Sequence, residues 1–346
     1  MSETTAGLSY GAAGVSRDAA ARAKRRIAEL VESTRTENVV SRPGGFGGLF
    51  RVPAGFRKPV LVSSADGVGT KLKVAMKAER HDTVGIDLVN HCVNDILVEG
   101  ARPLFFLDYI AMGLLDPRIA AELVAGLARA CRDSGCVLLG GETAEMPDFY
   151  QPGEYDLAGF IVGMVDEDAR PGAHRVSSGQ LLVALASSGF HTNGYSLLRR
   201  VLFDRLRLGV HDPYPESAET VADVLLRPHR SYLASVLPLL DAGAISALAH
   251  ITGGGIPENL VRVLPEGIRA HIDLASWRVP LEFRVVQQRG RIEENEMFLT
   301  FNMGVGMILI VPPERVDATL AHLGERGEQA WIIGVVLNGS REVTIR

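Results

Sequence analysis

Three carboxylates that lie far apart in the chain have neighbours suited to a cation site. Asp66 follows an apolar run and precedes glycines, Asp95 stands inside an apolar run, and Glu142 directly follows two glycines. Mg²⁺ binds few carboxylates together with phosphate oxygens and water. An unpaired carboxylate in an apolar run is costly, so Asp95 needs a cation or a buried partner. These residues predict a magnesium-nucleotide site with Asp66, Asp95 and Glu142 as ligands, provided that the fold brings them together.

The segments around these carboxylates supply the other groups that a nucleotide site needs. Gly67 and Gly69 allow backbone N–H groups to approach a phosphate, and Lys71 offers an ammonium group that neutralises phosphoryl oxygens. We therefore expect the nucleotide to contact Asp66, Gly67, Gly69, Thr70, Lys71, Asp95, Gly140, Gly141, Glu142 and Thr143. Residue types alone leave a solvated turn, capped by the Asp66 side chain, as the alternative for the first of these segments.

Two polar loops in the second half of the chain lead into predicted helices. One comprises residues 187–196 and contains His191, and the other comprises residues 250–255 and begins with His250. Free N–H groups and the helix dipole favour phosphate at a helix N-terminus. These loops predict substrate binding by His191, Asn193, Thr252, Gly253, Gly254 and Gly255. Either histidine is a candidate general acid or base, or a hydrogen-bond donor to phosphate, and plain helix-entry turns are the alternative.

A third pattern lies on the predicted helix at residues 83–99. Asp87, His91 and Asp95 recur at a spacing of four residues and share one helix face. Asp87 is as well explained by the helix dipole, which favours a carboxylate in an early turn, as by a functional role. We interpret His91 as a histidine that is satisfied on the helix face.

The elements that position these residues alternate between helix and strand. Apolar periodicity and turn residues predict helices at 18–31, 83–99, 117–133, 193–206, 232–240, 257–263 and 314–323, and strands at 59–64, 104–110, 137–139, 155–165, 181–186, 307–311 and 330–336. Glycine and proline between residues 166 and 179 predict a domain boundary, which divides the chain into residues 1–170 and 171–346. No P-loop motif and no His-Glu-x-x-His motif occurs.

Composition limits the partners and the compartment. The 346 residues are 47% hydrophobic and carry a net charge of −5, so a two-domain globular protein is expected and nucleic acid is a poor partner. Three cysteines without a Cys-x-x-Cys pair fit a reducing cytoplasm. No apolar stretch reaches the roughly 18 residues of a membrane span. We expect a cytoplasmic protein that acts on a small molecule and does not bind membranes.

Taken together, nine stretches resemble the phosphoribosylformylglycinamidine cyclo-ligase (aminoimidazole ribonucleotide synthetase) family. They are residues 44–48, 66–71, 81–87, 93–97, 103–109, 140–147, 191–196, 252–255 and 300–306. Each glycine-containing stretch is weak alone, whereas nine in the same order are a strong signal. The resemblance implies an α/β (α+β) fold with an N-terminal ATP-binding and dimerisation domain and a C-terminal α/β domain. The N-terminal sheet would form a shared barrel in a homodimer.

The resemblance also implies a reaction. ATP and Mg²⁺ would drive ring closure of formylglycinamidine ribonucleotide to 5-aminoimidazole ribonucleotide, with release of ADP and phosphate, in de novo purine biosynthesis. In this interpretation the γ-phosphoryl group activates the formyl oxygen, and no covalent enzyme nucleophile is needed. Lys71, His191 and His250 are the expected catalytic residues, acting by charge neutralisation and proton transfer.

Two alternatives stay open. The family has a basic residue and two carboxylates where this chain has Gly11, Ala12 and Ser16, and it commonly has Arg where this chain has Leu299. Lost charges favour a paralogue that activates or cyclises a related ribonucleotide in a specialised nucleoside pathway. A catalytically silent dimeric nucleotide-binding protein is the other alternative, although it would not need Asp66, Lys71, Asp95 and Glu142 together.

Overall fold

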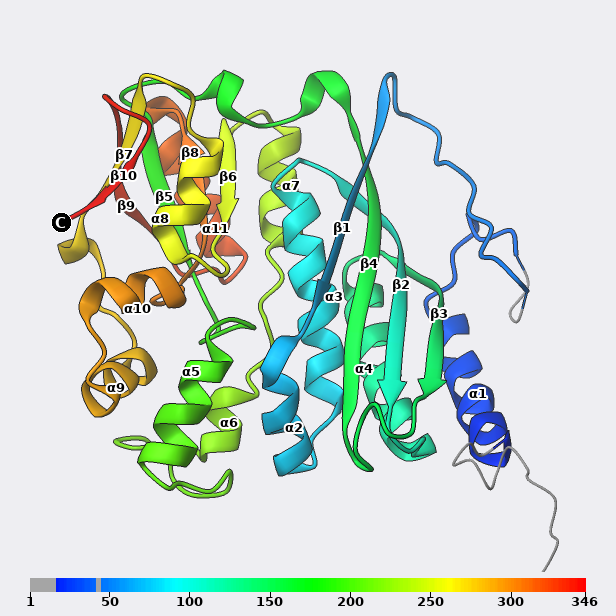
Figure 1. The fold of residues 1–346 in the computed structure, drawn as a ribbon. Coiled ribbons are helices and arrows are strands. Elements are labelled where there is room, and N and C mark those ends of the chain that lie inside the picture. The colour runs from blue at the N-terminus through cyan, green and yellow to red at the C-terminus, as the bar shows by residue number, and fades with distance from the viewer. Residues whose placement is uncertain (1–16, 42–44) are drawn as a thin grey trace, which may run out of the picture.

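The computed structural model describes residues 17–41 and 45–346, which form two α/β units, each built on one mixed sheet (Figure 1). Gly11, Ala12, Ser16 and Gly44 lie outside the described residues. The helices and strands are α1 (Arg17–Glu32), β1 (Pro59–Gly67), α2 (Leu72–Ala78), α3 (Asp82–Leu97), β2 (Arg102–Met112), α4 (Pro117–Asp133), β3 (Val137–Glu145), β4 (Tyr155–Asp166), β5 (Leu181–Ala186), α5 (Tyr195–Arg199), α6 (Val221–Leu225), α7 (Leu233–Asp241), β6 (Ala247–His250), α8 (Gly255–Leu260), β7 (Ile268–Ile272), α9 (Leu281–Gly290), α10 (Glu294–Thr300), β8 (Val305–Val311), α11 (Val316–Glu325), β9 (Ala330–Asn338) and β10 (Val343–Ile345).

The N-terminal sheet has the strand order β1-β4-β2-β3, with β4 antiparallel to both neighbours and β3 parallel to β2. Helices α3 and α4 cover one face of this sheet (Figure 1). The two helices cross closely because glycines meet at the crossing: a Cβ on Gly126 would lie 2.0 Å from the carbonyl oxygen of Asp82, and one on Gly85 would lie 2.3 Å from that of Leu123. This packing fixes α3 against the end of β1.

The opposite face of the N-terminal sheet has no helix on it in the described residues (Figure 1). Large apolar side chains are exposed there: Leu61 of β1 is 65% exposed, and Phe160 of β4 and Tyr109 of β2 are each 41% exposed. An exposed apolar sheet face of this kind is typical of an interaction surface. We call Leu61, Tyr109 and Phe160 the open sheet face.

The C-terminal sheet has the order β10-β7-β9-β5-β8-β6. Strand β8, between β5 and the edge strand β6, is buried at every residue, and β5 pairs antiparallel with both β8 and β9. The predicted boundary between residues 170 and 171 falls in the connection from β4 to β5. A π-helical segment, Arg200–Arg205, continues α5.

Most predicted elements are present, and several shorter ones were missed. The helix at 117–133 is confirmed at both ends; Asp116 caps it by accepting hydrogen bonds from the N–H groups of Arg118 and Ile119. The predicted strand at 137–139 is too short, because β3 continues to Glu145. Missed elements are α2, α6, α9, α10, β6, β7 and β10. Among the described residues, no helix is both long and apolar enough to span a membrane.

Candidate functional site

Asp66 and Asp95 meet at the end of β1, where α3 packs against the strand. His91, one helical turn before Asp95, joins them: its Nε2 lies 2.8 Å from Asp66 Oδ2 and 3.6 Å from Asp95 Oδ2. The hydroxyl of Ser64 on β1 donates to Asp95 Oδ2 at 3.0 Å. The prediction that Asp66 and Asp95 lie together is therefore confirmed. His91 lies between these two carboxylates, whereas the sequence suggested an ordinary histidine on the helix face.

From Asp95 the hydrogen bonds continue through the C-terminal half and return to α3. His250 Nδ1, at the end of β6, lies 2.8 Å from Asp95 Oδ1, and its Nε2 lies 3.0 Å from His229 Nε2. His229 Nδ1 lies 3.3 Å from Thr192 Oγ1, which lies 2.8 Å from His91 Nδ1. We call these five residues and Asp66 the histidine ring. It supplies the buried partner that Asp95 requires.

Donor and acceptor roles around the histidine ring follow from the acceptor-only character of a carboxylate. Asp95 accepts from His250 Nδ1, so neutral His250 accepts at Nε2 from His229. His229 then accepts the Thr192 hydroxyl proton at Nδ1. This leaves His91 to donate from both nitrogens, which assigns it a positive charge, with the tautomers inferred from the hydrogen-bond geometry.

The pKa shifts agree with this assignment. Burial alone would lower the pKa of His91, but the hydrogen bond to Asp66 and the charges of the nearby carboxylates outweigh it and raise that pKa. Burial alone would raise the pKa of Asp66, yet the hydrogen bond and charge of His91 leave it lowered. Asp95 behaves in the same way, because the hydrogen bonds from His250 and Ser64 and the charge of His91 oppose burial and lower its pKa. Both carboxylates are therefore held in the charged form.

The donor set fits a hard divalent cation at Asp66 and Asp95. The side chains of Asp66 and Asp95 are 41% and 26% exposed, so their oxygens are accessible. Each oxygen accepts hydrogen bonds and retains acceptor capacity, and Mg²⁺ prefers such oxygens to imidazole nitrogens. His191, His229 and His250 also have ligand atoms within 4.8 Å of one another. However, the rings of His191 and His229 stack at 3.9 Å and 22°, so their lone pairs run side by side and do not converge on one ion.

His191 lies beneath the histidine ring and is buried. Its Nε2 accepts a hydrogen bond from the N–H of Ser188 at 3.2 Å, so neutral His191 carries its proton on Nδ1. That Nδ1 is buried and has no hydrogen-bond partner among the described residues. Burial lowers the pKa of His191 well below its ordinary value, and the positive charges of Lys71 and His91 act in the same direction. His191 is thus a neutral N–H donor in this conformation.

Lys71 is fully buried, and its predicted role in neutralising a phosphate stays a prediction. The side chain is completely buried, and Nζ donates to Asp87 Oδ1 at 2.8 Å and to the carbonyl oxygens of His191 at 3.0 Å and Arg227 at 2.8 Å. These contacts use all three ammonium protons. Burial lowers the pKa of Lys71, and the charge of Asp87 opposes that shift. Lys71 and Asp87 therefore form a buried ion pair that joins the two halves of the chain.

Side chains of α3 extend this connection along the segment from Arg227 to Tyr232. Asp87 accepts a hydrogen bond from the N–H of His229 at 2.6 Å, and Asn90 donates to the carbonyl of His229 at 2.7 Å. Asn94 accepts from the N–H of Tyr232 at 3.0 Å and donates to the carbonyl of Arg230 at 2.7 Å. The α3 face that holds Asp95 thus also fixes the segment that carries His229.

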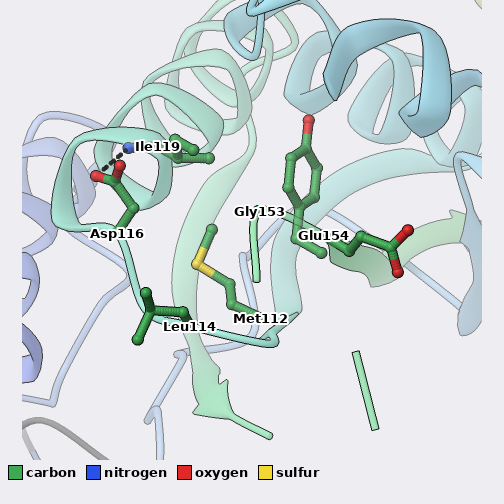
Figure 2. A pocket seen from close by; sticks show the side chains of 7 residues that line it. Met112, Leu114, Asp116, Ile119, Gly153 and Glu154 are labelled. Carbon is green, nitrogen blue, oxygen red and sulfur yellow. Dashed lines mark hydrogen bonds between the residues drawn. The ribbon is translucent and has the colours of Figure 1, made fainter. Parts of the chain in front are cut away.

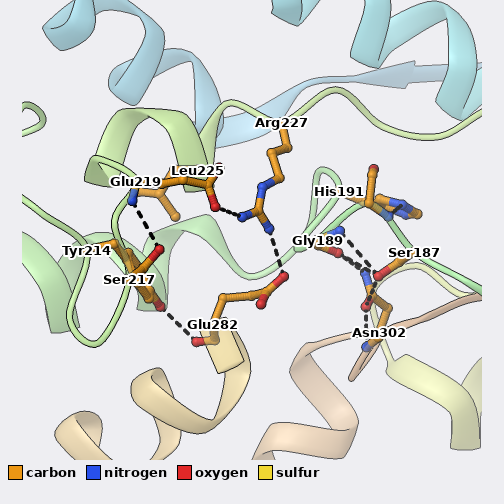
Figure 3. A network of polar contacts seen from close by, with 12 residues as sticks. Ser187, Gly189, His191, Tyr214, Ser217, Glu219, Leu225, Arg227, Glu282 and Asn302 are labelled. Carbon is orange, nitrogen blue, oxygen red and sulfur yellow. Dashed lines mark hydrogen bonds and ion pairs between the residues drawn. The ribbon is translucent and has the colours of Figure 1, made fainter. Parts of the chain in front are cut away.

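A second polar network supports the loop before His191 (Figure 3). The Ser187 hydroxyl donates to Asn302 Oδ1 at 3.0 Å, and Asn302 Nδ2 donates to the carbonyl of Gly189 at 2.8 Å. On the other side of the loop, the Arg227 guanidinium pairs with Glu282 at 3.0 Å and with Glu219. These contacts hold both the His191 loop and the carbonyl group that binds Lys71.

Glu142 does not lie beside Asp66 and Asp95 within one chain, so the three predicted ligands do not come together in a single subunit. The residues from Gly140 to Thr143 lie inside β3, because pairing with β2 continues from Leu107–Gly140 to Met112–Glu145. β1 and β3 are the two edges of the sheet, three strand spacings or roughly 14 Å apart. Glu142 also pairs with Tyr109 and shares the open sheet face, whereas Asp66 faces α3.

The remaining predicted residues lie around the Asp66 end of β1 or in the C-terminal loops. Gly67 ends β1, Gly69 has a φ of +64° and begins a 3₁₀ turn with Thr70, and the Thr70 hydroxyl lies 3.1 Å from that of Ser196. The loop from Thr252 to Gly255 is held by Asn259, whose Nδ2 donates to the carbonyls of Thr252, Gly253 and Gly255. Gly255 must be glycine, because a Cβ there would lie 1.8 Å from the carbonyl oxygen of Phe298. Asn193 contacts this loop, since its Oδ1 lies 3.4 Å from the position of a Cβ on Gly253.

A small cavity of about 110 Å³ at the end of β2 is not part of this site (Figure 2). Its lining includes Met112, Leu114 and Tyr155 and has no lysine or arginine. Its two carboxylates serve the fold: Asp116 caps α4, and Glu154 pairs with Lys73. The cavity therefore offers no group for a phosphate.

The comparisons with known proteins bear on the whole chain. The family model "AIR synthase related protein, N-terminal domain" matches residues 53–165, and its C-terminal counterpart matches residues 177–346. Phosphoribosylformylglycinamidine cyclo-ligase from Trichlorobacter lovleyi is 52% identical over 97% of this chain and 96% of its own length. The chain belongs to the phosphoribosylformylglycinamidine cyclo-ligase family. The cyclo-ligase from Alkaliphilus metalliredigens is 48% identical, covering 98% of both chains.

Solved structures outside the cyclo-ligase family share its fold. Thiamine-monophosphate kinase from Stenotrophomonas maltophilia is 16% identical with a TM-score of 0.69, covering 92% of this chain and 95% of its own. The hydrogenase maturation protein HypE in complex with ATP is 18% identical with a TM-score of 0.66, covering 91% and 88%. The expected family and two-domain α/β fold are thus confirmed. The cyclo-ligase family is ATP-dependent.

Proposed function

We propose that this chain catalyses the ATP-dependent ring closure of formylglycinamidine ribonucleotide to 5-aminoimidazole ribonucleotide, with release of ADP and phosphate. Ionised Asp66 and Asp95 beside a glycine-containing loop are the observation that carries the proposal, in a chain about half identical to curated cyclo-ligases. De novo purine biosynthesis in the cytoplasm is the corresponding setting. ATP and Mg²⁺ are the corresponding cofactors, and Asp66 and Asp95 would hold the ion.

The reaction balances as a phosphoryl transfer followed by a displacement. The formyl oxygen takes the γ-phosphoryl group, the ribose-bearing amidine nitrogen bonds to the formyl carbon, and the phosphorylated oxygen leaves as phosphate while that nitrogen loses a proton. Bound Mg²⁺ supplies neutralisation of phosphate charge. His91 and His250 keep Asp66 and Asp95 ionised, and the neutral His191 Nδ1–H is a donor for a substrate oxygen. His250 has both nitrogens engaged in the histidine ring, so a proton taken up there would pass along it.

We also propose that the chain acts as a homodimer, with residues 1–170 binding ATP and forming the dimer and residues 171–346 supplying the substrate loops. The open sheet face supports this, since Leu61 is 65% exposed and a second copy would cover it. Two four-stranded sheets that close into a barrel can place β3 of one beside β1 of the other. Gly67 of β1 and Glu142 of β3 lie in one row of paired residues that runs across the sheet. In such a barrel, Gly140, Gly141, Glu142 and Thr143 of a second copy would therefore lie at the same height along the strands as Asp66.

The test of the proposed function is turnover by the purified full-length chain. Incubation with ATP, Mg²⁺ and formylglycinamidine ribonucleotide should yield 5-aminoimidazole ribonucleotide and ADP in equal amounts. Asp95→Asn should lower kcat by at least about 100-fold, because it removes an anionic ligand for the ion, while leaving the fold intact. Asp82→Asn, in the exposed first turn of the same helix, should keep full activity.

Two outcomes would contradict the proposed function. ATP binding without product, together with turnover of a related ribonucleotide, would favour the paralogue. ATP binding without ribonucleotide-dependent hydrolysis would favour the silent binding protein. Unfolding of Asp95→Asn, seen by circular dichroism, would assign Asp95 a structural role, and Asp66→Asn would then test the cation site.

A further inference from the structure

A cavity of about 530 Å³ lies where α2 of the N-terminal half meets α5 and the π-helical segment after it. It lies on the Thr70 side of α2, outside the histidine ring. The lining residues that bear on its chemistry are Lys77, Ser196, Arg199, Arg200, Phe203 and Asp204. A volume of this size is within the usual range of small-molecule sites, roughly 300–1,000 Å³.

The cavity concentrates positive charge that the protein does not neutralise. Lys77, Arg199 and Arg200 form no ion pair with any carboxylate in residues 17–41 and 45–346, and Asp204 is the one acidic residue in the lining. The Nε of Arg199 is buried and has no hydrogen-bond partner in that part of the chain. Because the chain as a whole has a net charge of −5, three unpaired cations around one cavity are a local exception. Their chemistry favours a doubly charged anion.

Two contacts fix this cavity in place beside the Asp66 loop. The Ser196 hydroxyl lies 3.1 Å from that of Thr70, which belongs to the loop after Asp66. Lys77 lies on α2, the helix that directly follows this loop, and its ammonium is 5.1 Å from the centre of the Phe203 ring. A ligand that reaches from the cavity along Thr70 therefore approaches the carboxylates of the cation site.

We propose that this cavity binds the 5′-phosphate of the phosphoribosyl group of the substrate. The inference rests on the proposed function, because it takes the ribonucleotide as the ligand. A guanidinium group binds two phosphate oxygens at once, and Arg199 and Arg200 supply two such groups beside the ammonium of Lys77. Ser196 adds a hydroxyl between the cavity and Thr70. The phosphate would anchor one end of the substrate while its formylamidine end reaches Asp66 and Asp95.

Kinetics of arginine variants test this inference. Arg199→Gln and Arg200→Gln should each raise KM for formylglycinamidine ribonucleotide by roughly 10- to 100-fold, the effect of losing a charge-assisted contact, with little change in KM for ATP. Arg205→Gln is the matched control, since Arg205 lies on the same π-helical segment but does not line the cavity. It should leave both KM values within about twofold of the parent.

A binding measurement separates failure of this inference from failure of the proposed function. Calorimetric titration with ribose 5-phosphate, without ATP, should show binding to the parent protein that Arg199→Gln and Arg200→Gln weaken, and ribose should not bind. If ribose 5-phosphate binds in this way but no ring closure occurs, the phosphate site is supported and the proposed function is wrong. If ring closure proceeds while neither variant changes KM for the ribonucleotide, the phosphate site is wrong. A rise in KM for ATP alone would assign the cavity to ATP and overturn the inference.

Discussion

At the residue scale, hydrogen-bond partners decide which carboxylates stay charged. Asp66 and Asp95 each accept from a histidine and from a second donor, which keeps their pKa values lowered despite burial. Asp108 on β2 is a contrast, because burial raises its pKa to about 7. It lies on the helix-covered face, where a Cβ on Gly141 would lie 2.2 Å from its Oδ1. The fold therefore binds a proton at Asp108 that the unfolded chain has released.

This difference predicts a pH-dependent stability. Because the pKa of Asp108 is raised from 3.8 to about 7 on folding, the folded state loses stability as pH rises between these values. Asp108→Asn removes the penalty, so it should stabilise the protein more at pH 8 than at pH 5, by about 3 kcal/mol in the free energy of unfolding. Urea titrations at both pH values measure this. Asp133→Asn, at an exposed position, should not raise the free energy of unfolding in this way. An equal effect of Asp108→Asn at both pH values would contradict the raised pKa of Asp108.

At the element scale, α3 serves two purposes with one face. Asp95 and His91 belong to the proposed cation site, while Asp87, Asn90 and Asn94 bind the backbone of the segment from Arg227 to Tyr232. The buried Lys71–Asp87 pair lies at one end of this connection. Removing one partner of such a pair leaves a buried charge without compensation.

Lys71→Met should therefore act on stability first. We expect a loss of about 3–5 kcal/mol in the free energy of unfolding, measured by urea titration, because Asp87 would stay buried without its cation. Asp87→Asn in the same chain should recover part of that loss. Exposed Lys24→Met on α1 is the control and should change stability by less than about 0.5 kcal/mol. A fully stable Lys71→Met that is inactive would support the predicted role of Lys71 at the phosphate.

The sequence predicted best the features that depend only on residues close together in the chain. The spacing of Asp87, His91 and Asp95 predicted one helix face, and Asp116 with Pro117 set the start of α4. His229 was missed because it lies in a segment without regular structure and reaches the site only through contacts with α3. The position of Glu142 was not predicted, because strand length cannot be read from two glycines: β3 continues through them by pairing with β2. The burial of Lys71 was not predicted, because it depends on the packing of both halves.

At the scale of the whole molecule, the open sheet face predicts the oligomeric state. Leu61→Asp places a charge on this face and should convert a dimer into a monomer, because burying an unpaired carboxylate at the interface is unfavourable. Sedimentation equilibrium measures the change. Val52→Asp, also exposed but outside the sheet, should leave the mass unchanged. A parent protein that is monomeric at micromolar concentration would contradict the proposed dimer.

We propose that the β3 segment of one subunit, including Glu142, completes the nucleotide site that Asp66 and Asp95 form in the other subunit. Asp95→Asn and Glu142→Gln chains, co-expressed with different tags and purified through both, give heterodimers with one complete site and one doubly altered site. Each homodimer should be nearly inactive, and the heterodimer should recover about half of the parent's ring-closure rate. A heterodimer as inactive as the two homodimers, with its dimeric mass intact, would contradict the shared site.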